Sequence, residues 1–337
     1  MQSIIILCIL DFIFMGFTKA KITKPSEIPV CDISALLDGS NPLGVAQELR
    51  AASSGLGFIY IKGHDIPQCI INNARAEAYK FFRSNKTQKL ATSITNNHRG
   101  WIDAGGAKMG DVGKPDLKES FLWGFDNLGQ SNHSLRGQNT WPAKNLNMQI
   151  ATMEYFKRVH KIAQDLMSGF ALGLDLDKNF FLKTSNKPLS RGSFVYYPDQ
   201  SKKNADEQFG SSPHTDFGVL TVLAQDDVGG LQIKNRDGHW IKASPIPETL
   251  IINVADLLHR WTAGAYKSTP HRVINISGRE RLSIVLAYDP NPETIIDPCD
   301  IFGQNFKDGE PPITCGDYLD WRFDKAFAYR KDHSIAQ

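Results

Sequence analysis

The stretch Phe209-Gly-Ser-Ser-Pro-His-Thr-Asp-Phe-Gly-Val-Leu-Thr-Val-Leu223 decides the fold and the site of this chain. It ends in a run of β-branched and apolar residues, Val219–Leu223, which predicts a strand. If His214 and Asp216 lie on extended backbone, their side chains point to the same side and can reach one metal ion. A His-x-Asp sequence is also common as a hydrogen-bonded surface pair, so these residues alone leave both interpretations open.

A second histidine, His271, completes a candidate metal site. It follows Asp216 by 271 − 216 = 55 residues, too far for a motif on one helix, so another strand must bring it close. Two imidazoles and one carboxylate suit non-haem Fe(II) and leave coordination positions open for substrate chemistry. Two alternatives stay open: a hydrolytic Zn(II) site with three protein ligands and water, and a non-catalytic small-molecule binding protein.

Arg281-Leu-Ser283 opens a further apolar run that ends at Tyr288. On a strand, Arg281 and Ser283 face one side and Leu282 faces the other. A guanidinium beside a hydroxyl is a good receptor for a carboxylate, because arginine stays charged and binds carboxylates through two hydrogen bonds. The alternative is an arginine at a strand edge in a solvated ion pair.

The pattern of short strands predicts a jelly roll. Between about residues 190 and 290, β-rich runs alternate with turn signals. The runs are 193–197, 219–223, 231–234, 240–242, 250–254, 272–276 and 282–288. Many short antiparallel strands that close on a site are typical of that fold.

Helices are predicted on both sides of this β region. Residues 144–174 carry an apolar stripe at helical spacing: Met153, Phe156, His160, Ala163, Met167 and Phe170. We interpret His160 as a residue at the edge of the stripe that packs against the strands, not as a ligand. Further helices are predicted at 67–89 and 318–330.

Several segments, in order, resemble the isopenicillin N synthase-like branch of the iron(II)/2-oxoglutarate-dependent dioxygenases. The resemblance runs from about Ile28 to Arg330. The segments are Gly57–Pro67, Lys114–Phe121, Tyr196–Pro198, Gly229–Gln232, Ile252–Asp256, Lys267–Val273 and Arg281–Ser283. The fold that it implies is mainly β with flanking α: a double-stranded β-helix (jelly-roll) core, an N-terminal α/β region, a long support helix and a C-terminal helix.

The expected organisation follows from the resemblance and the patterns together. A signal-like or disordered leader covers 1–26, the N-terminal non-haem dioxygenase region 27–130, and the support helix 144–174. The Fe(II)/2-oxoglutarate dioxygenase jelly-roll domain covers 185–290, and the C-terminal extension 291–337.

By the resemblance, the iron ligands are His214, Asp216 and His271. The cofactors are then Fe(II), 2-oxoglutarate as co-substrate and O2, with ascorbate as a candidate reductant. The implied activity is hydroxylation, desaturation or cyclisation of a small molecule in specialised metabolism.

The resemblance also assigns the co-substrate site. Arg281 and Ser283 would bind the far carboxylate of 2-oxoglutarate, with help from Tyr197. Many relatives carry Asn two residues before that tyrosine, where this chain has Val195, which weakens the assignment of Tyr197. The alternative is an iron oxidase that does not use 2-oxoglutarate, because isopenicillin N synthase and the aminocyclopropane-carboxylate oxidases share the Arg-x-Ser.

The candidate substrate wall is aromatic. It consists of Phe121, Trp123, Tyr196 and Phe217, with the C-terminal helix around Phe323 and Phe327, and it suggests a partly apolar ligand. Each of these side chains could equally fill the core.

Composition fits a globular enzyme: 337 residues, 41% hydrophobic, 22% charged and a net charge of +2. No basic stripe points to nucleic acid. Residues 1–20 resemble a secretory signal and are too short and interrupted for stable insertion in a membrane. The five cysteines lack metal-ligand or disulfide spacing and are interpreted as free thiols. We therefore expect a cytoplasmic monomer, with the secretory pathway as the alternative.

Overall fold

Strands from both halves of the chain share one large sheet in the computed structural model, which describes residues 20–21, 27–110, 114–126, 133–200 and 208–331. Its eight strands lie in the order β1-β2-β10-β7-β12-β5-β4-β3. They are β1 (Val30–Asp32), β2 (Phe58–Lys62), β3 (Gly100–Ile102), β4 (Glu119–Gly124), β5 (Arg191–Tyr197), β7 (Leu220–Ala224), β10 (Leu250–Val254) and β12 (Arg281–Tyr288). All neighbours are antiparallel except β1 and β2. The predicted N-terminal region therefore contributes four strands to this sheet.

A smaller antiparallel sheet faces the large one. Its order is β6-β11-β8-β9, from β6 (Ser211–His214), β8 (Leu231–Lys234), β9 (Trp240–Lys242) and β11 (His271–Val273). An apolar cluster that includes Val195, Leu223, Leu231 and Ile233 joins the inner faces of the two sheets. In the described residues the two sheets form an open sandwich, and β13 (Ile295–Ile296) pairs separately with β14 (Ile313–Thr314).

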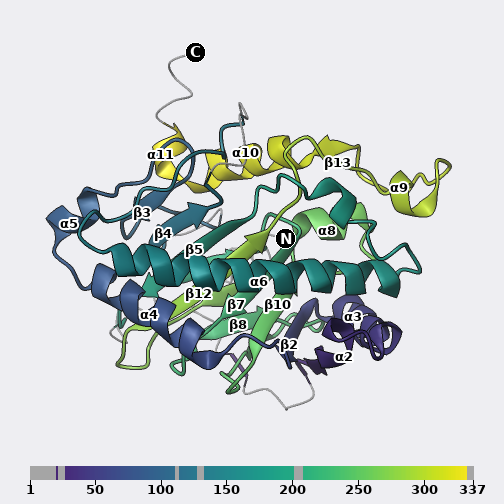
Figure 1. The fold of residues 1–337 in the computed structure, drawn as a ribbon, viewed down its shortest axis with the longest axis horizontal. Helices are drawn as coiled ribbons and strands as arrows, with labels where there is room; N and C mark the ends of the chain where they lie inside the picture. The colour runs from purple at the N-terminus through teal and green to yellow at the C-terminus, as the bar shows by residue number, and fades with distance from the viewer. Residues whose placement is uncertain (1–19, 22–26, 111–113, 127–132, 201–207, 332–337) are drawn as a thin grey trace, which may run out of the picture.

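The support helix, α6 (Leu146–Gly173), runs across the outer face of the large sheet (Figure 1). Asn145 caps it by accepting a hydrogen bond from the amide of Met148. The predicted stripe is buried apart from Met153, which is half-buried. Burial extends beyond the stripe, to Tyr155 for example, because α3 (Pro42–Gly55) and α4 (Gln68–Phe82) also pack on α6.

Two predicted helices are each divided in the structure. The one expected at 67–89 ends at Phe82, and α5 (Lys86–Leu90) starts afresh with Asn85 as its cap. The one expected at 318–330 starts earlier, as α10 (Cys315–Ala326), and α11 (Ala328–Lys331) follows an extended Phe327. Phe327 forms an isolated bridge with Ala107, which interrupts the helix. The described ranges also contain α2 (Ser34–Leu37), the 3-10 turn η1 (Leu182–Thr184), α8 (Asp256–Trp261) and α9 (Cys299–Phe302).

The loop from β11 to β12 is fixed by a buried amide. The Nδ2 atom of Asn275 donates to the carbonyls of Tyr197, Pro198 and Arg279, at 3.3, 3.2 and 2.7 Å. Its Oδ1 accepts from the hydroxyl of Ser277 at 2.7 Å. This loop therefore enters β12 tied to the end of β5.

The predicted leader lies almost entirely outside the described residues. Of the residues that are described, Lys21 donates its amide to the carbonyl of Trp240 at 2.8 Å. Within the described ranges, no helix is long and apolar enough to cross a membrane. Cys31, Cys69, Cys299 and Cys315 are free thiols, as predicted for them.

His160 gives the fold a pH dependence that can be measured. Its Nε2 lies 3.2 Å from the hydroxyl of Ser190, and Phe125, Phe156 and Tyr288 pack around the ring. Burial lowers the pKa of His160 from 6.5 to about 4. Between these pH values the unfolded chain binds a proton that the folded chain does not. The stability that follows is fully present above pH 6.5 and is lost as pH falls towards 4, by up to about 1.4 kcal/mol per pH unit.

We therefore predict that His160→Gln flattens the fall in stability of the metal-free protein between pH 6.5 and pH 4. Glutamine keeps a hydrogen-bonding group near Ser190 and has no charge to gain. The measurement is the free energy of unfolding in urea across this range, for the parent and the variant. Equal slopes in the two proteins would contradict the assignment.

Candidate metal and co-substrate site

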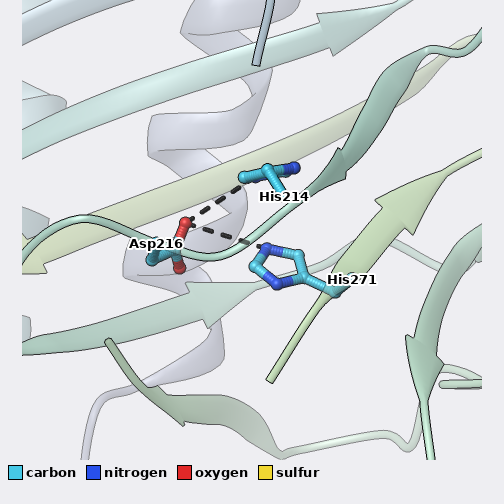
Figure 2. Close-up of side chains that lie close together, drawn as sticks. All are labelled: His214, Asp216 and His271. Atoms are coloured by element: carbon cyan, nitrogen blue, oxygen red, sulfur yellow. Dashed lines mark ion pairs between the residues drawn. The ribbon is translucent and has the colours of Figure 1, made fainter. Parts of the chain in front are cut away.

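Cross-strand pairing brings the two candidate histidine ligands together. His271 of β11 lies directly opposite His214, the last residue of β6, and their ring centroids are 4.3 Å apart. Asp216 lies just past β6, in the loop towards β7, so only His214 of this pair is on the strand. The expectation that both lie on one strand was wrong in that detail. The loop nevertheless turns the carboxylate towards both rings (Figure 2).

The three side chains converge on one point. Oδ1 of Asp216 lies 3.8 Å from Nε2 of His214 and 3.7 Å from Nε2 of His271. The three ligand atoms all lie within 4.8 Å of one another, and in the described part of the chain this group could hold a metal ion. Two imidazole nitrogens and one carboxylate oxygen on one side leave the opposite side for other ligands.

Neighbouring polar groups orient each ligand atom. Nδ1 of His214 lies 2.7 Å from the carbonyl oxygen of Ser212, and Nδ1 of His271 lies 3.2 Å from that of Thr269. A proton on Nδ1 donated to a carbonyl leaves Nε2 as the free lone pair of a metal ligand. Asn253 on β10 donates Nδ2 to Oδ2 of Asp216 at 2.8 Å, which leaves Oδ1 for the metal.

The protonation states also suit metal binding. Burial, together with the neighbouring His271, lowers the pKa of His214 to about 3, so this imidazole is neutral at pH 7. Burial raises the pKa of Asp216, but the adjacent imidazoles of His271 and His214, together with hydrogen bonds from Thr221 and Asn253, hold the pKa below its usual value. A neutral imidazole and an ionised carboxylate are the forms that bind metals.

Arg281 and Ser283 lie on β12, on the inner face of the large sheet, while Leu282 faces the core on the other side, as predicted. Arg281 is 1% exposed and Ser283 is 2% exposed. Three buried atoms have no hydrogen-bond partner in the described residues: Nε and Nη1 of Arg281 and Oγ of Ser283. The guanidinium lies 4.7 Å from the centre of the Tyr197 ring, which favours a cation–π contact.

One cavity of about 170 Å³, the inner cavity, connects the three ligand residues with Arg281 and Ser283. Tyr197 and Lys118 also line it. The carboxylate receptor therefore opens into the same space as the candidate metal site, and both sheets contribute to its walls.

The predicted substrate residues on β4 do not line this cavity. Phe121 and Trp123 are fully buried on the opposite face of the strand, where Phe121 contacts Phe81 and Trp123 contacts Phe194. The alternate residues of β4, Ser120 and Leu122, line the cavity instead. Because side chains alternate along a strand, choosing the aromatic positions selected the wrong face.

The other predicted aromatic residues divide between core and site. Tyr196 also faces away from the inner cavity: its ring stacks on Phe82 and its hydroxyl donates to Glu280 at 2.9 Å. Phe217 lines a second cavity beside His214, and Phe327 lines the inner one. Phe323 is buried against Phe217.

Sequence reasoning missed Asn253 and Lys118. An asparagine inside the otherwise apolar strand Leu250–Val254 is a signal that could have found the first. Lys118 donates Nζ to the hydroxyl of Ser211 at 2.9 Å and lies 3.3 Å from Oδ2 of Asp116. A buried lysine has no comparable signal in its local sequence.

The sequence matches two families of known proteins. The profile described as 2OG-Fe(II) oxygenase superfamily matches residues 192–290, and that of the non-haem dioxygenase N-terminal region in morphine synthesis matches 28–144. A homoarginine-6-hydroxylase of Glycine max is 32% identical, over 82% of this chain and 90% of its own length. The chain belongs to the 2OG-Fe(II) oxygenase superfamily.

A solved structure and a second sequence relative are also similar to this chain. The crystal structure of a full-length Neurospora crassa protein in complex with alpha-KG superposes with a TM-score of 0.80 at 27% identity, covering 90% of this chain and 98% of that one. A 1-aminocyclopropane-1-carboxylate oxidase of Dictyostelium discoideum is 31% identical over 80% of this chain and 83% of its own. The jelly-roll prediction is confirmed, and the chain is a non-haem dioxygenase that uses Fe(II), 2-oxoglutarate and O2 to oxidise a small molecule.

We predict that His214→Ala, Asp216→Ala and His271→Ala each abolish tight Fe(II) binding. Asn253→Ala should weaken it about 10- to 100-fold, because it frees the carboxylate that Asn253 orients. The measurement is an anaerobic titration of the metal-free protein with Fe(II).

A matched control is His239→Ala, since Asp237 and His239 form a second pair with the same two-residue spacing, exposed in the turn between β8 and β9. This variant should bind Fe(II) as the parent does. Full iron occupancy in the Asp216→Ala protein would contradict the ligand assignment.

Proposed function

We propose that His214, Asp216 and His271 hold Fe(II), and that Arg281 and Ser283 bind the far carboxylate of 2-oxoglutarate. The observation that carries this proposal is the pair of unpartnered buried groups on β12 that share the inner cavity with the three ligand residues. With Fe(II) bound, oxidative decarboxylation of 2-oxoglutarate by O2 would supply the oxidising power to attack an unactivated C–H bond.

The carboxylate assignment follows from the energetics of Arg281. Burying a guanidinium without a counter-charge destabilises the folded protein. The loss of its hydrogen bonds to water adds to that cost. A bound carboxylate would accept from the free Nε and Nη1, and the hydroxyl of Ser283 could donate to the same group. Tyr197 packs against the guanidinium and holds its plane.

Much of the remaining wall of the inner cavity is apolar. Leu122, Val195, Leu223 and Leu231 line the inner cavity, so a ligand there would displace water from apolar surface. Lys118 also lines the inner cavity, where Asp116, 3.3 Å from its ammonium, offsets its charge.

We infer hydroxylation as the reaction outcome, because the Glycine max relative is named a hydroxylase. Desaturation and cyclisation differ from it in mass, since hydroxylation adds one oxygen and the other two remove two hydrogens. We further infer that the protein is a cytoplasmic monomer that acts in specialised metabolism. The cytoplasmic location is supported by the free thiols of the described chain, which fit a reducing compartment.

We predict that Arg281→Gln weakens 2-oxoglutarate binding by roughly 2–5 kcal/mol, as expected when one partner of a buried charge pair is lost. The readout is the visible charge-transfer band that rises when 2-oxoglutarate is added to the anaerobic Fe(II) protein. Arg279→Gln is the matched control: this exposed arginine lies two residues earlier and pairs with Asp227. Absence of the band in the parent, with no succinate formed under O2, would instead indicate an oxidase that does not use 2-oxoglutarate.

The substrate can be sought without prior assumption. Protein, Fe(II), 2-oxoglutarate and O2 would be incubated with an extract of the source organism and analysed for mass changes of one oxygen or two hydrogens. Modification of a protein or nucleic-acid fraction, with no change among small metabolites, would contradict a free small-molecule substrate.

A further inference from the structure

A second and larger cavity, the outer cavity, lies next to the inner one. Its volume is about 680 Å³, and it shares His214 and Met109 with the inner cavity. Its other walls come from three parts of the chain: the segment around Lys108 that follows β3, the segment around His214 that includes Phe217, and α10. A ligand in the outer cavity would therefore lie beside the candidate metal ligands.

Cationic side chains dominate this space. Lys108, Arg322 and Lys325 line it, against one carboxylate, Asp324. Asp324 is already paired, since Nε of Arg330 donates to its Oδ1 at 2.6 Å. The ammonium of Lys108 makes no ion pair within the described residues. Arg322 is paired with Asp256, so in the described residues the positive charge that no carboxylate offsets belongs to Lys108 and Lys325.

Arg322 is held in place and still has donors to offer. Its side chain is 22% exposed, Nη1 lies 3.0 Å from Oδ2 of Asp256, and the guanidinium lies 4.0 Å from the centre of the Phe217 ring. In the described part of the chain, both its ion pair with Asp256 and its hydrogen bond to the Tyr318 hydroxyl use Nη1. Nε and Nη2 remain for a ligand, and a fixed fork loses little entropy on binding.

The anchor of Arg322 is tied to the candidate metal site. Asp256 accepts from the hydroxyl of Thr215 at 3.0 Å and from that of Ser268 at 2.7 Å. Thr215 lies between His214 and Asp216, so one carboxylate fixes both Arg322 and the ligand-bearing loop. The distance from Arg322 to the metal site is therefore set by the ion pair of Asp256 with Arg322 and by its hydrogen bond from Thr215.

We propose that the outer cavity binds the substrate by an anionic group, so that the substrate is a small organic acid with an apolar body. Arg322 would bind the anion, Lys108 would add charge, and Phe217 and Met109 would contact the apolar part. This inference rests on the proposed function, because the anion site is placed relative to the Fe(II) and 2-oxoglutarate positions. The inference gives the chemical class of the substrate, which the predicted aromatic substrate wall did not define.

The test is calorimetric titration, under nitrogen, of the protein loaded with Fe(II) and 2-oxoglutarate. The probes are arylacetates, medium-chain fatty acids and phosphate monoesters, each paired with its neutral amide or alcohol. We expect at least one acid to bind about tenfold or more tightly than its neutral counterpart, and Arg322→Gln to remove that difference. Lys108→Gln should reduce the difference in affinity a few-fold. Because this variant leaves no carboxylate unpaired, it still tests the inference if Arg322→Gln fails to fold.

Arg158→Gln, an exposed arginine on α6 in an ion pair with Glu154, is the control and should bind every probe as the parent does. Equal affinity for acids and neutral counterparts, or a charge preference that survives both Arg322→Gln and Lys108→Gln, would overturn the inference. Failure of the proposed function would be seen separately, as a parent protein that does not bind 2-oxoglutarate before any probe is added.

Discussion

The pairing of β6 with β11 is the contact on which the rest of the site depends. It sets His214 directly opposite His271, and a shift of one residue would turn one of the two rings to the other face of the sheet. The short strands alone could not hold that register. Lys118 donates to the hydroxyl of Ser211, and Asp116 accepts from the amide and the hydroxyl of Ser212, so both residues hold β6 in place.

The same sandwich places a costly group in its interior. Arg281 is buried without a counter-charge among the described residues, and the large sheet must supply the free energy to keep it there. A co-substrate that neutralises it should therefore stabilise the folded protein as well as bind to it. Binding and folding are coupled at Arg281 because the carboxylate site exists only in the folded protein.

The sequence allowed the core of this arrangement to be predicted because two-residue spacing on strands maps directly to one face. That logic held for Arg281 and Ser283. The predicted runs correspond to β5 and to β7–β12, while β6 was not among them. The same logic failed for Phe121 and Trp123. Which side chains of β4 face the inner cavity depends on how β4 pairs with β5, and the local sequence does not contain that information. The role of Asn253 depended on contacts between strands distant in the chain, as did the place of Lys118.

The buried amide of Asn275 has a consequence for the route by which the chain is made. Asn275-Ile-Ser277 is a glycosylation acceptor sequence, yet in the fold its Nδ2 is fully committed to three carbonyls. A sugar attached there during synthesis would remove those bonds and separate the end of β5 from the start of β12. Export through a compartment that glycosylates nascent chains would then yield protein lacking the Arg281 site, unless this asparagine escaped modification.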